Sequence, residues 1–179
     1  NIYIDQISQT DIVTEPILFD LYYGGKSASE SLEEGDTTPL ETVMRPVTEE
    51  TPIFRQIYIS HLVCRNARRA MFFNGLPEMN VQQVVMEHLA ISAQLGAELS
   101  EASAVQLRDV VIQAAEGPAL KLNNVKNSTL EQVRLLSPDT KKVSVTGKRT
   151  ARIQLGKEIE PHELNVAPEV NAGEITGFQ

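Results

Sequence analysis

The stretch Gln56-Ile57-Tyr58-Ile59-Ser60-His61-Leu62 recurs along this chain of 179 residues. It aligns with residues 83–89 and 104–110, and more loosely with residues 128–133, while residues 1–7 fit the same frame. Taking the last apolar residue of each repeat as an anchor gives spacings of 27, 21 and 23 residues by subtraction, for the anchors Leu62, Leu89, Val110 and Val133. A period in the twenties is typical of solenoids and corresponds to about one coil of a parallel β-helix.

A second short strand is expected at a steady offset after each of these segments. The candidates are residues 17–20, 71–74, 97–100, 120–123 and 143–146. All five end in a small polar residue, and three alternate apolar and polar residues, a period of two that places the apolar set on one buried face. Turn residues such as Asn74-Gly75 and Glu116-Gly117-Pro118 separate the strands.

The sequence therefore predicts an all-β chain folded as a right-handed parallel β-helix. A helix over residues 84–99 is disfavoured because residues 105–112, in the equivalent part of the next repeat, alternate and are rich in β-branched residues. Two interior rows are expected. The first contains Leu62, Leu89, Val110 and Val133, and the second contains Phe73, Leu99, Leu122 and Val145.

A single domain is expected, with coils over residues 1–150 and a cap or tail over residues 151–179. The repeat is interrupted at residues 24–52 by an acidic loop insertion rich in Ser, Thr and Pro, which fits either solvated surface or a lid beside a cleft. The chain begins at Asn1 without a methionine or a leader, so it is expected to be a fragment or a processed product. An unpaired edge at residues 1–7 would then be covered by the N-terminal half of the same protein or by self-association.

Composition excludes several classes of function. The net charge of −8 argues against nucleic-acid binding, which depends on an excess of Lys and Arg. The longest apolar runs, Ile17–Phe19 and Ala70–Phe73, are far shorter than a membrane span requires, so no membrane span is expected. Cys64 is the one cysteine; it cannot form an internal disulfide and is expected in the core.

Four segments of the chain resemble a known enzyme family. They are residues 1–4, 17–26, 51–57 and 69–78, and the likeness extends from Asn1 to about Leu135. Through them the chain resembles the family 28 glycoside hydrolases, the polygalacturonase and rhamnogalacturonase group. The resemblance implies a secreted, periplasmic or cell-surface protein whose partner is a pectic polysaccharide, either galacturonan or rhamnogalacturonan. It implies no cofactor.

The catalytic motifs of that family are missing. The sequence contains no Asp-Asp pair, no Gly-His-Gly and no Arg-Ile-Lys. The family cleaves α-galacturonosyl linkages by inversion, with two carboxyl groups about 6.5–9.5 Å apart on either side of the bond. The resemblance therefore implies the C-terminal coils of a pectin-degrading hydrolase, with no catalytic residue in this chain and no activity when it is isolated. The alternative is a non-catalytic carbohydrate-binding or adhesive β-helix, which the fold suits equally well.

Asp20, Tyr22, Tyr23 and Lys26 are the candidate substrate-binding residues. An aromatic ring can stack on a sugar and a lysine can pair with a uronate carboxylate. Adjacent tyrosines point to opposite faces of a strand, so at most one of them would face a ligand. The alternative for Asp20 is a structural role, because it occupies the same corner position as Asn74 and Ser100 in later repeats.

No metal site is expected. His61 and His88 each precede an anchor leucine, in a position that Gln6, Asp109 and Gln132 fill in other repeats, so a solvated or turn-bonded role is expected for both. His162 has no other ligand residue at a suitable spacing, and no cluster of carboxylates suggests a calcium-dependent lyase. The basic cluster Arg65, Arg68 and Arg69 fits a solvated coil edge or ion pairs with the acidic insertion better than a uronate site.

Overall fold

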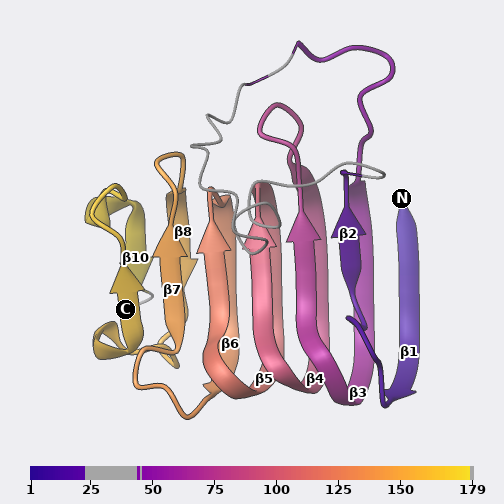
Figure 1. Cartoon of the computed structure of the whole chain (residues 1–179), viewed down its shortest axis with the longest axis vertical. Coiled ribbons are helices and arrows are strands. Elements are labelled where there is room, and N and C mark those ends of the chain that lie inside the picture. The colour runs from indigo at the N-terminus through magenta and orange to yellow at the C-terminus, as the bar shows by residue number, and fades with distance from the viewer. Residues whose placement is uncertain (23–43, 45, 178–179) are drawn as a thin grey trace.

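The computed structural model describes residues 1–22, 44 and 46–177, and in this part of the chain it is a stack of parallel β-strands (Figure 1). The main path through the sheet is β1-β3-β4-β5-β6-β8-β10, with β2, β7 and β9 paired beside it. The longer strands are β1 (Ile2–Thr10), β3 (Arg55–Asn74), β4 (Val81–Ser100), β5 (Ala102–Asn123) and β6 (Lys126–Leu136). The shorter strands are β2 (Leu18–Asp20), β7 (Val143–Thr146), β8 (Ala151–Leu155), β9 (Leu164–Val166) and β10 (Ile175–Gly177). Every strand pairing is parallel, so the architecture is the predicted parallel β-helix.

The first predicted interior row is confirmed by the strand register. Leu62 of β3 pairs with Leu89 of β4, Leu89 with Val110 of β5, and Val110 with Val133 of β6. All four side chains are buried. Stacked coils thus bury the same apolar position repeatedly, and each residue removed from water contributes to stability roughly in proportion to its apolar area.

The second predicted row is confirmed in the same way. Phe73 pairs with Leu99, Leu99 with Leu122, and Leu122 with Val145 of β7, and all four are buried. Phe73 is fully buried and meets the ring of Phe19 edge to face, with 4.8 Å between ring centroids. Each of β3, β4 and β5 therefore carries one residue of both rows.

The coils turn corners at residues with left-handed backbone conformation. One row of corners has φ between 49° and 59° and consists of Gln6, His61, His88, Asp109 and Gln132. A second row, with φ between 51° and 59°, consists of Gln56, Gln83, Ala104, Asn127 and Arg152. Short polar side chains tolerate this conformation better than β-branched ones. The position before each anchor residue is thus polar, because the backbone turns a corner there and the side chain faces solvent.

The stack continues beyond residue 150, into the segment predicted as a cap or tail. There β8 pairs with β6, β9 with β7, and β10 with β8, and short 3₁₀ helices precede β9 and β10 at Pro161–Glu163 and Ala172–Glu174. Most of the acidic insertion, residues 24–52, lies outside the described residues.

Two smaller expectations concern single features. Cys64 is buried, as expected, and burial raises the pKa of its thiol. Across residues 1–22, 44 and 46–177, the structure contains no helix long and apolar enough to cross a membrane.

The carboxylate of Glu163 is held near the C-terminal end of the stack by Lys142. Its Oε1 lies 2.5 Å from Lys142 Nζ, and its Oε2 accepts the backbone N–H of Glu160 at 3.1 Å. Burial acts to raise the pKa of Glu163, but Lys142 and the N–H together hold that pKa below its usual value. A carboxyl with a lowered folded-state pKa stabilises the fold above its unfolded pKa, and this contribution is lost as pH falls through the folded pKa.

We therefore expect Glu163→Gln to lower the free energy of unfolding by about 1 kcal/mol at pH 7. The difference from the wild type should shrink as pH falls below about 4.3, where half of the unfolded carboxyl groups are protonated. Urea unfolding at a series of pH values measures it, with exposed Glu50→Gln as the matched control. A difference that stays constant down to low pH would contradict the pairing.

Candidate functional site

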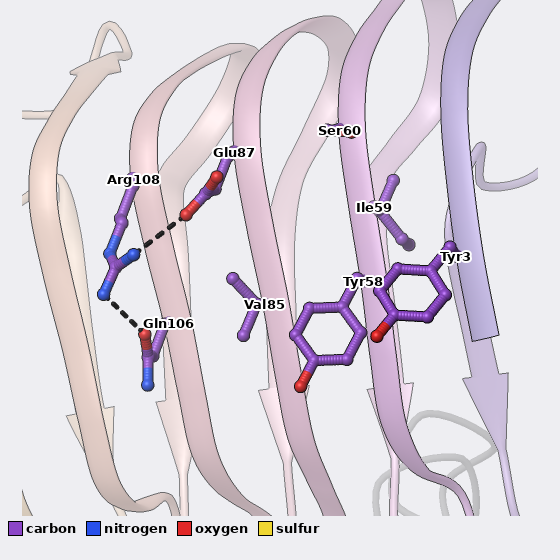
Figure 2. Close-up of a pocket in the computed structure, with 8 residues that line it drawn as sticks. All are labelled: Tyr3, Tyr58, Ile59, Ser60, Val85, Glu87, Gln106 and Arg108. Atoms are coloured by element: carbon purple, nitrogen blue, oxygen red, sulfur yellow. Dashed lines mark hydrogen bonds and ion pairs between the residues drawn. The ribbon is translucent and has the colours of Figure 1, made fainter. Parts of the chain in front are cut away.

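Side chains at one repeat position line up across the outer face of the stack. Tyr3 of β1 pairs in register with Tyr58 of β3, Tyr58 with Val85 of β4, and Val85 with Gln106 of β5. Figure 2 shows these side chains standing on neighbouring strands and projecting from the same face. Because the strands are parallel and in register, one position of the repeat becomes a row across the surface.

Two tyrosines form an aromatic wall at one side of this row. The rings of Tyr3 and Tyr58 are stacked, with 4.8 Å between centroids and 13° between planes. One face of Tyr58 is covered by Tyr3, and the next position across the sheet from Tyr58 is filled only by the short side chain of Val85 (Figure 2). The side of the Tyr58 ring away from Tyr3 therefore borders a gap above Val85.

Polar groups form the opposite wall. Arg108 Nη2 donates to Gln106 Oε1 at 2.9 Å, and Arg108 Nη1 donates to Glu87 Oε1 at 2.9 Å (Figure 2). Arg108 Nε also lies 3.8 Å from Glu131 Oε2 on the next coil. This network holds the planar amide of Gln106 and the guanidinium in place, so the wall is organised before any ligand arrives.

The gap between the two walls is a hollow of about 400 Å³. A second hollow of about 300 Å³ shares Tyr58, Val85 and Gln106 and extends toward Gln56 and Gln83, so a groove follows the outer face. We call the space between Tyr58 and Gln106, above Val85, the tyrosine slot. Its walls stand two strands apart, about 9.5 Å between backbones.

The dimensions of the tyrosine slot fit one flat ring. Optimal contact between carbon atoms is at about 3.5–4 Å, so a ring held between two planar groups needs about 7–8 Å in total. The slot offers an aromatic ring on one side and hydrogen-bond donors and acceptors on the other. A pyranose ring has the same division, with C–H groups on its face and hydroxyl groups at its edge.

Comparisons with protein-family models, with curated proteins and with solved structures find no match to this chain. The fold and the geometry of its surface are therefore the basis of the functional argument.

Two of the four substrate-binding residues expected from sequence lie in the described part of the chain. Asp20 ends β2 and pairs in register with Asn74, in a row that continues through Ser100, Asn123 and Thr146. Its Oδ1 accepts from Asn74 Nδ2 at 3.0 Å and from the backbone N–H of Tyr22 at 2.9 Å. This is the structural corner role that the repeat alignment offered for Asp20.

Tyr23 and Lys26 lie outside the described residues, so their role in sugar binding stays a prediction. Asp20 is in register with the last residue of β3, whereas Tyr58 lies near the beginning of that strand. The structure thus places Asp20 beside the end of β3 and the tyrosine slot near its beginning.

The basic cluster is partly engaged in internal contacts. Arg69 Nε lies 3.8 Å from Glu15 Oε1, and the guanidinium stands 4.4 Å from the centre of the Phe72 ring. Within the described residues, the acidic partner of Arg69 is therefore Glu15, which precedes β2 in the chain.

The residues of the tyrosine slot are not among the binding residues predicted from the sequence. A signal was present, because Tyr58, Val85 and Gln106 occupy the same position of the aligned repeats. A large, a small and a planar polar residue in succession at one outward position of a solenoid make a slot. Recognising it requires knowing that this position faces outward.

Proposed function

We propose that this chain is a carbohydrate-binding part of a parallel β-helix and that the tyrosine slot holds one sugar ring. The observation that carries the proposal is the exposed Tyr58 ring and the Gln106 amide lining one hollow on either side of the short Val85. Aromatic faces bind the apolar side of flat ligands, while a few fixed polar groups set orientation.

The polar wall favours hydroxyl groups as its ligands. Arg108 supplies N–H donors, Glu87 supplies carboxylate acceptors, and the Gln106 amide supplies both, which matches the mixed donor and acceptor character of a sugar hydroxyl. A free uronate carboxylate would meet Arg108 but would also approach the carboxylates of Glu87 and Glu131. We therefore expect the slot to prefer a neutral or esterified sugar unit within a pectic chain.

We extend the proposal to the whole protein of which this sequence would be part. The chain would form the C-terminal coils of a pectin-degrading glycoside hydrolase that acts by inversion, with the catalytic carboxylates supplied by coils upstream. Support comes from the segments that resemble the polygalacturonase and rhamnogalacturonase group, and from the parallel β-helix that this resemblance implies. Such a protein would act outside the cytoplasm. The second candidate function is a non-catalytic adhesive β-helix, which would bind its carbohydrate in the same groove.

Replacing Tyr58 by alanine tests the slot. We expect Tyr58→Ala to weaken binding of methyl-esterified galacturonan oligosaccharides at least tenfold, because one stacked aromatic face contributes about 1.4 kcal/mol or more. Tyr58→Phe keeps the ring and should bind within about twofold of the wild type. Isothermal titration calorimetry provides the measurement.

Val63→Ala is the matched control, since Val63 is an exposed apolar residue of the same strand beyond the corner at His61. Equal affinity for wild type and Tyr58→Ala would remove the slot from the proposal. The same samples are also assayed for new reducing ends. Binding without cleavage fits both candidate functions, whereas cleavage by these residues alone would contradict an upstream location for the catalytic carboxylates.

A further inference from the structure

A separate hollow of about 480 Å³ lies near the C-terminal end of the stack. Its walls come from three coils. Lys126 begins β6, residues 148–152 lead into and begin β8, and Asn171 and Glu174 precede β10. These three strands are neighbours in the sheet (Figure 1), so the hollow spans the corner at which three successive coils begin. It shares no lining residue with the tyrosine slot.

The charge of this hollow is opposite in sign to that of the chain. The whole chain carries a net charge of −8, yet four cationic side chains line the hollow, namely Lys126, Lys148, Arg149 and Arg152. A local excess of positive charge in a concave surface attracts anions and raises their concentration there. We call this space the basic hollow.

The two lysines of the basic hollow have unused donors. Across residues 1–22, 44 and 46–177, the ammonium groups of Lys126 and Lys148 have neither a hydrogen bond nor an ion pair. Each ammonium carries three N–H donors. Arg149 differs from them, because it is paired with the buried Glu101. An anion would therefore bind the lysines without first breaking an internal ion pair.

The two acidic side chains of the basic hollow are held by backbone N–H groups. Glu169 Oε1 accepts the N–H of Gly147 at 3.2 Å, and Glu174 Oε2 accepts the N–H of Arg152 at 2.9 Å. These hydrogen bonds fix one oxygen of each carboxylate on a neighbouring coil. The two carboxylates thus help to build the wall, and neither forms an ion pair with a lysine of the hollow among the described residues.

Two further residues supply donors at the rim. Arg152 Nε donates to Asn127 Oδ1, which orients the guanidinium and leaves the N–H groups of both Nη atoms unbonded within the described residues. Asn171 Oδ1 accepts the N–H of Gly173 at 3.0 Å, so the donors of the Asn171 amide stay unused in the same part of the chain. Unused donors therefore border the hollow on all three of its coils.

We propose that the basic hollow binds one oxyanion of the phosphate class, either inorganic phosphate or the phosphate monoester of a sugar. A phosphate monoester carries a charge of about −1.5 to −2 at pH 7 and presents three strong acceptor oxygens. Acceptors that point in several directions match donors that come from three coils, whereas a planar carboxylate matches a single arginine fork. The site does not depend on the proposed function.

Titration of the full chain with sodium phosphate at pH 7, followed by calorimetry, tests the proposal. We expect one phosphate bound per chain. Lys126→Gln and Lys148→Gln should each lower the affinity about threefold, because a partly exposed charge contact contributes modestly. The double variant should lower it at least tenfold. Added sodium chloride should weaken binding to the wild type, since salt screens exposed charges.

Lys121→Gln is the matched control. Lys121 is exposed on β5 and does not line the basic hollow, so the same loss of charge there should leave the affinity unchanged. Galactose 6-phosphate identifies the source of the phosphate group. Binding tighter than that of inorganic phosphate assigns the site to a sugar phosphate, and equal or weaker binding assigns it to free phosphate.

Four outcomes would overturn the proposal. They are no binding of phosphate, equal affinity in the wild type and the double variant, a loss in Lys121→Gln as large as in the double variant, and binding of galacturonate as tight as that of phosphate. The last outcome would show that the hollow recognises negative charge alone and not the phosphate group.

Discussion

Replacing Gly75 by alanine is expected to destabilise the fold by more than about 3 kcal/mol, the range in which a small domain loses much of its total stability. Gly75 follows the end of β3 and donates its N–H to Ser100 O at 3.0 Å. A Cβ at Gly75 would lie 2.0 Å from the carbonyl oxygen of Glu101 and 2.9 Å from the N of Val81. Both are backbone atoms, so no side-chain rotation relieves the clash.

The clash also acts on a contact between coils. The Glu101 carbonyl oxygen accepts the N–H of Val81 at 3.0 Å, which joins the start of β4 to the corner after it. Separating these atoms to admit a methyl group breaks that hydrogen bond. A buried backbone group left without a partner costs about as much as a lost hydrogen bond or more.

Gly117→Ala is the matched control for this prediction. Gly117 has φ of +67°, but a Cβ there would meet no atom within 4 Å. Its substitution should cost only the strain of an alanine in the left-handed region, about 1 kcal/mol. Urea unfolding of both variants measures the difference, and a Gly75→Ala cost no larger than that of Gly117→Ala would show that the coils separate easily at this corner.

Gly75 and Gly117 show what the sequence can and cannot predict about a turn. Both belong to segments that the sequence predicts as turns, Asn74-Gly75 and Glu116-Gly117-Pro118. Gly75 does follow the end of β3, whereas Gly117 lies within the continuous strand β5, where the register against β4 shifts. Periodicity identifies the turn because it marks where the apolar alternation stops. It cannot tell which turn is pressed against the next coil, because that depends on the register between segments some twenty residues apart.

The interior rows were predictable for a physical reason. In a parallel stack the same position of each repeat meets itself, so an alignment of repeats is already a list of contacts. Leu62 with Leu89 and Phe73 with Leu99 follow directly from that alignment and are confirmed. The outward positions vary from coil to coil, so Tyr58 and Gln106 could be aligned but their slot could not be recognised.

The least predictable feature is a polar cluster around Glu101. This residue is 6% exposed at a left-handed corner after β4, and its carboxylate accepts from Asn124 Nδ2 at 2.6 Å and from Asn80 Nδ2 at 3.3 Å. It also pairs with Arg149, which follows 48 residues later in the chain. No sequence spacing connects these residues, and only the stacked corners bring them together.

Removing this carboxylate is expected to be the most damaging polar substitution in the described part of the chain. Glu101→Ala leaves Arg149 without its counterion and the Asn124 amide without its acceptor, whereas Asn80 keeps its bond to Leu76 O; breaking a buried pair in this way costs about 3–5 kcal/mol. Arg149 Nε already has no hydrogen-bond partner, so no bond from Nε would replace the lost contact between the guanidinium and Glu101. Urea unfolding at pH 7 gives the cost directly.

Glu101→Gln separates the hydrogen bonds from the charge. The amide oxygen can still accept from Asn124 and Arg149, and only the long contact from Asn80 Nδ2 is lost, because Asn80 stays bound to Leu76 O; we therefore expect a cost of only about 1 kcal/mol at pH 7. Burial raises the pKa of Glu101, against the lowering effect of Arg149 and Asn124. A raised folded-state pKa means that the folded chain binds the proton more tightly than the unfolded chain does. The Glu101 carboxyl therefore stabilises the fold at low pH, and this contribution is lost as pH rises through its folded-state pKa.

The advantage of the wild type over Glu101→Gln should accordingly be larger at pH 4 than at pH 7, the reverse of the trend expected for Glu163→Gln. Urea unfolding of the three proteins at both pH values compares the trends in one experiment. If Glu101→Gln instead costs as much as Glu101→Ala at pH 7, the ionised pair with Arg149 dominates over the cost of burying the charge. The pH trend at Glu101 would then run in the same direction as at Glu163.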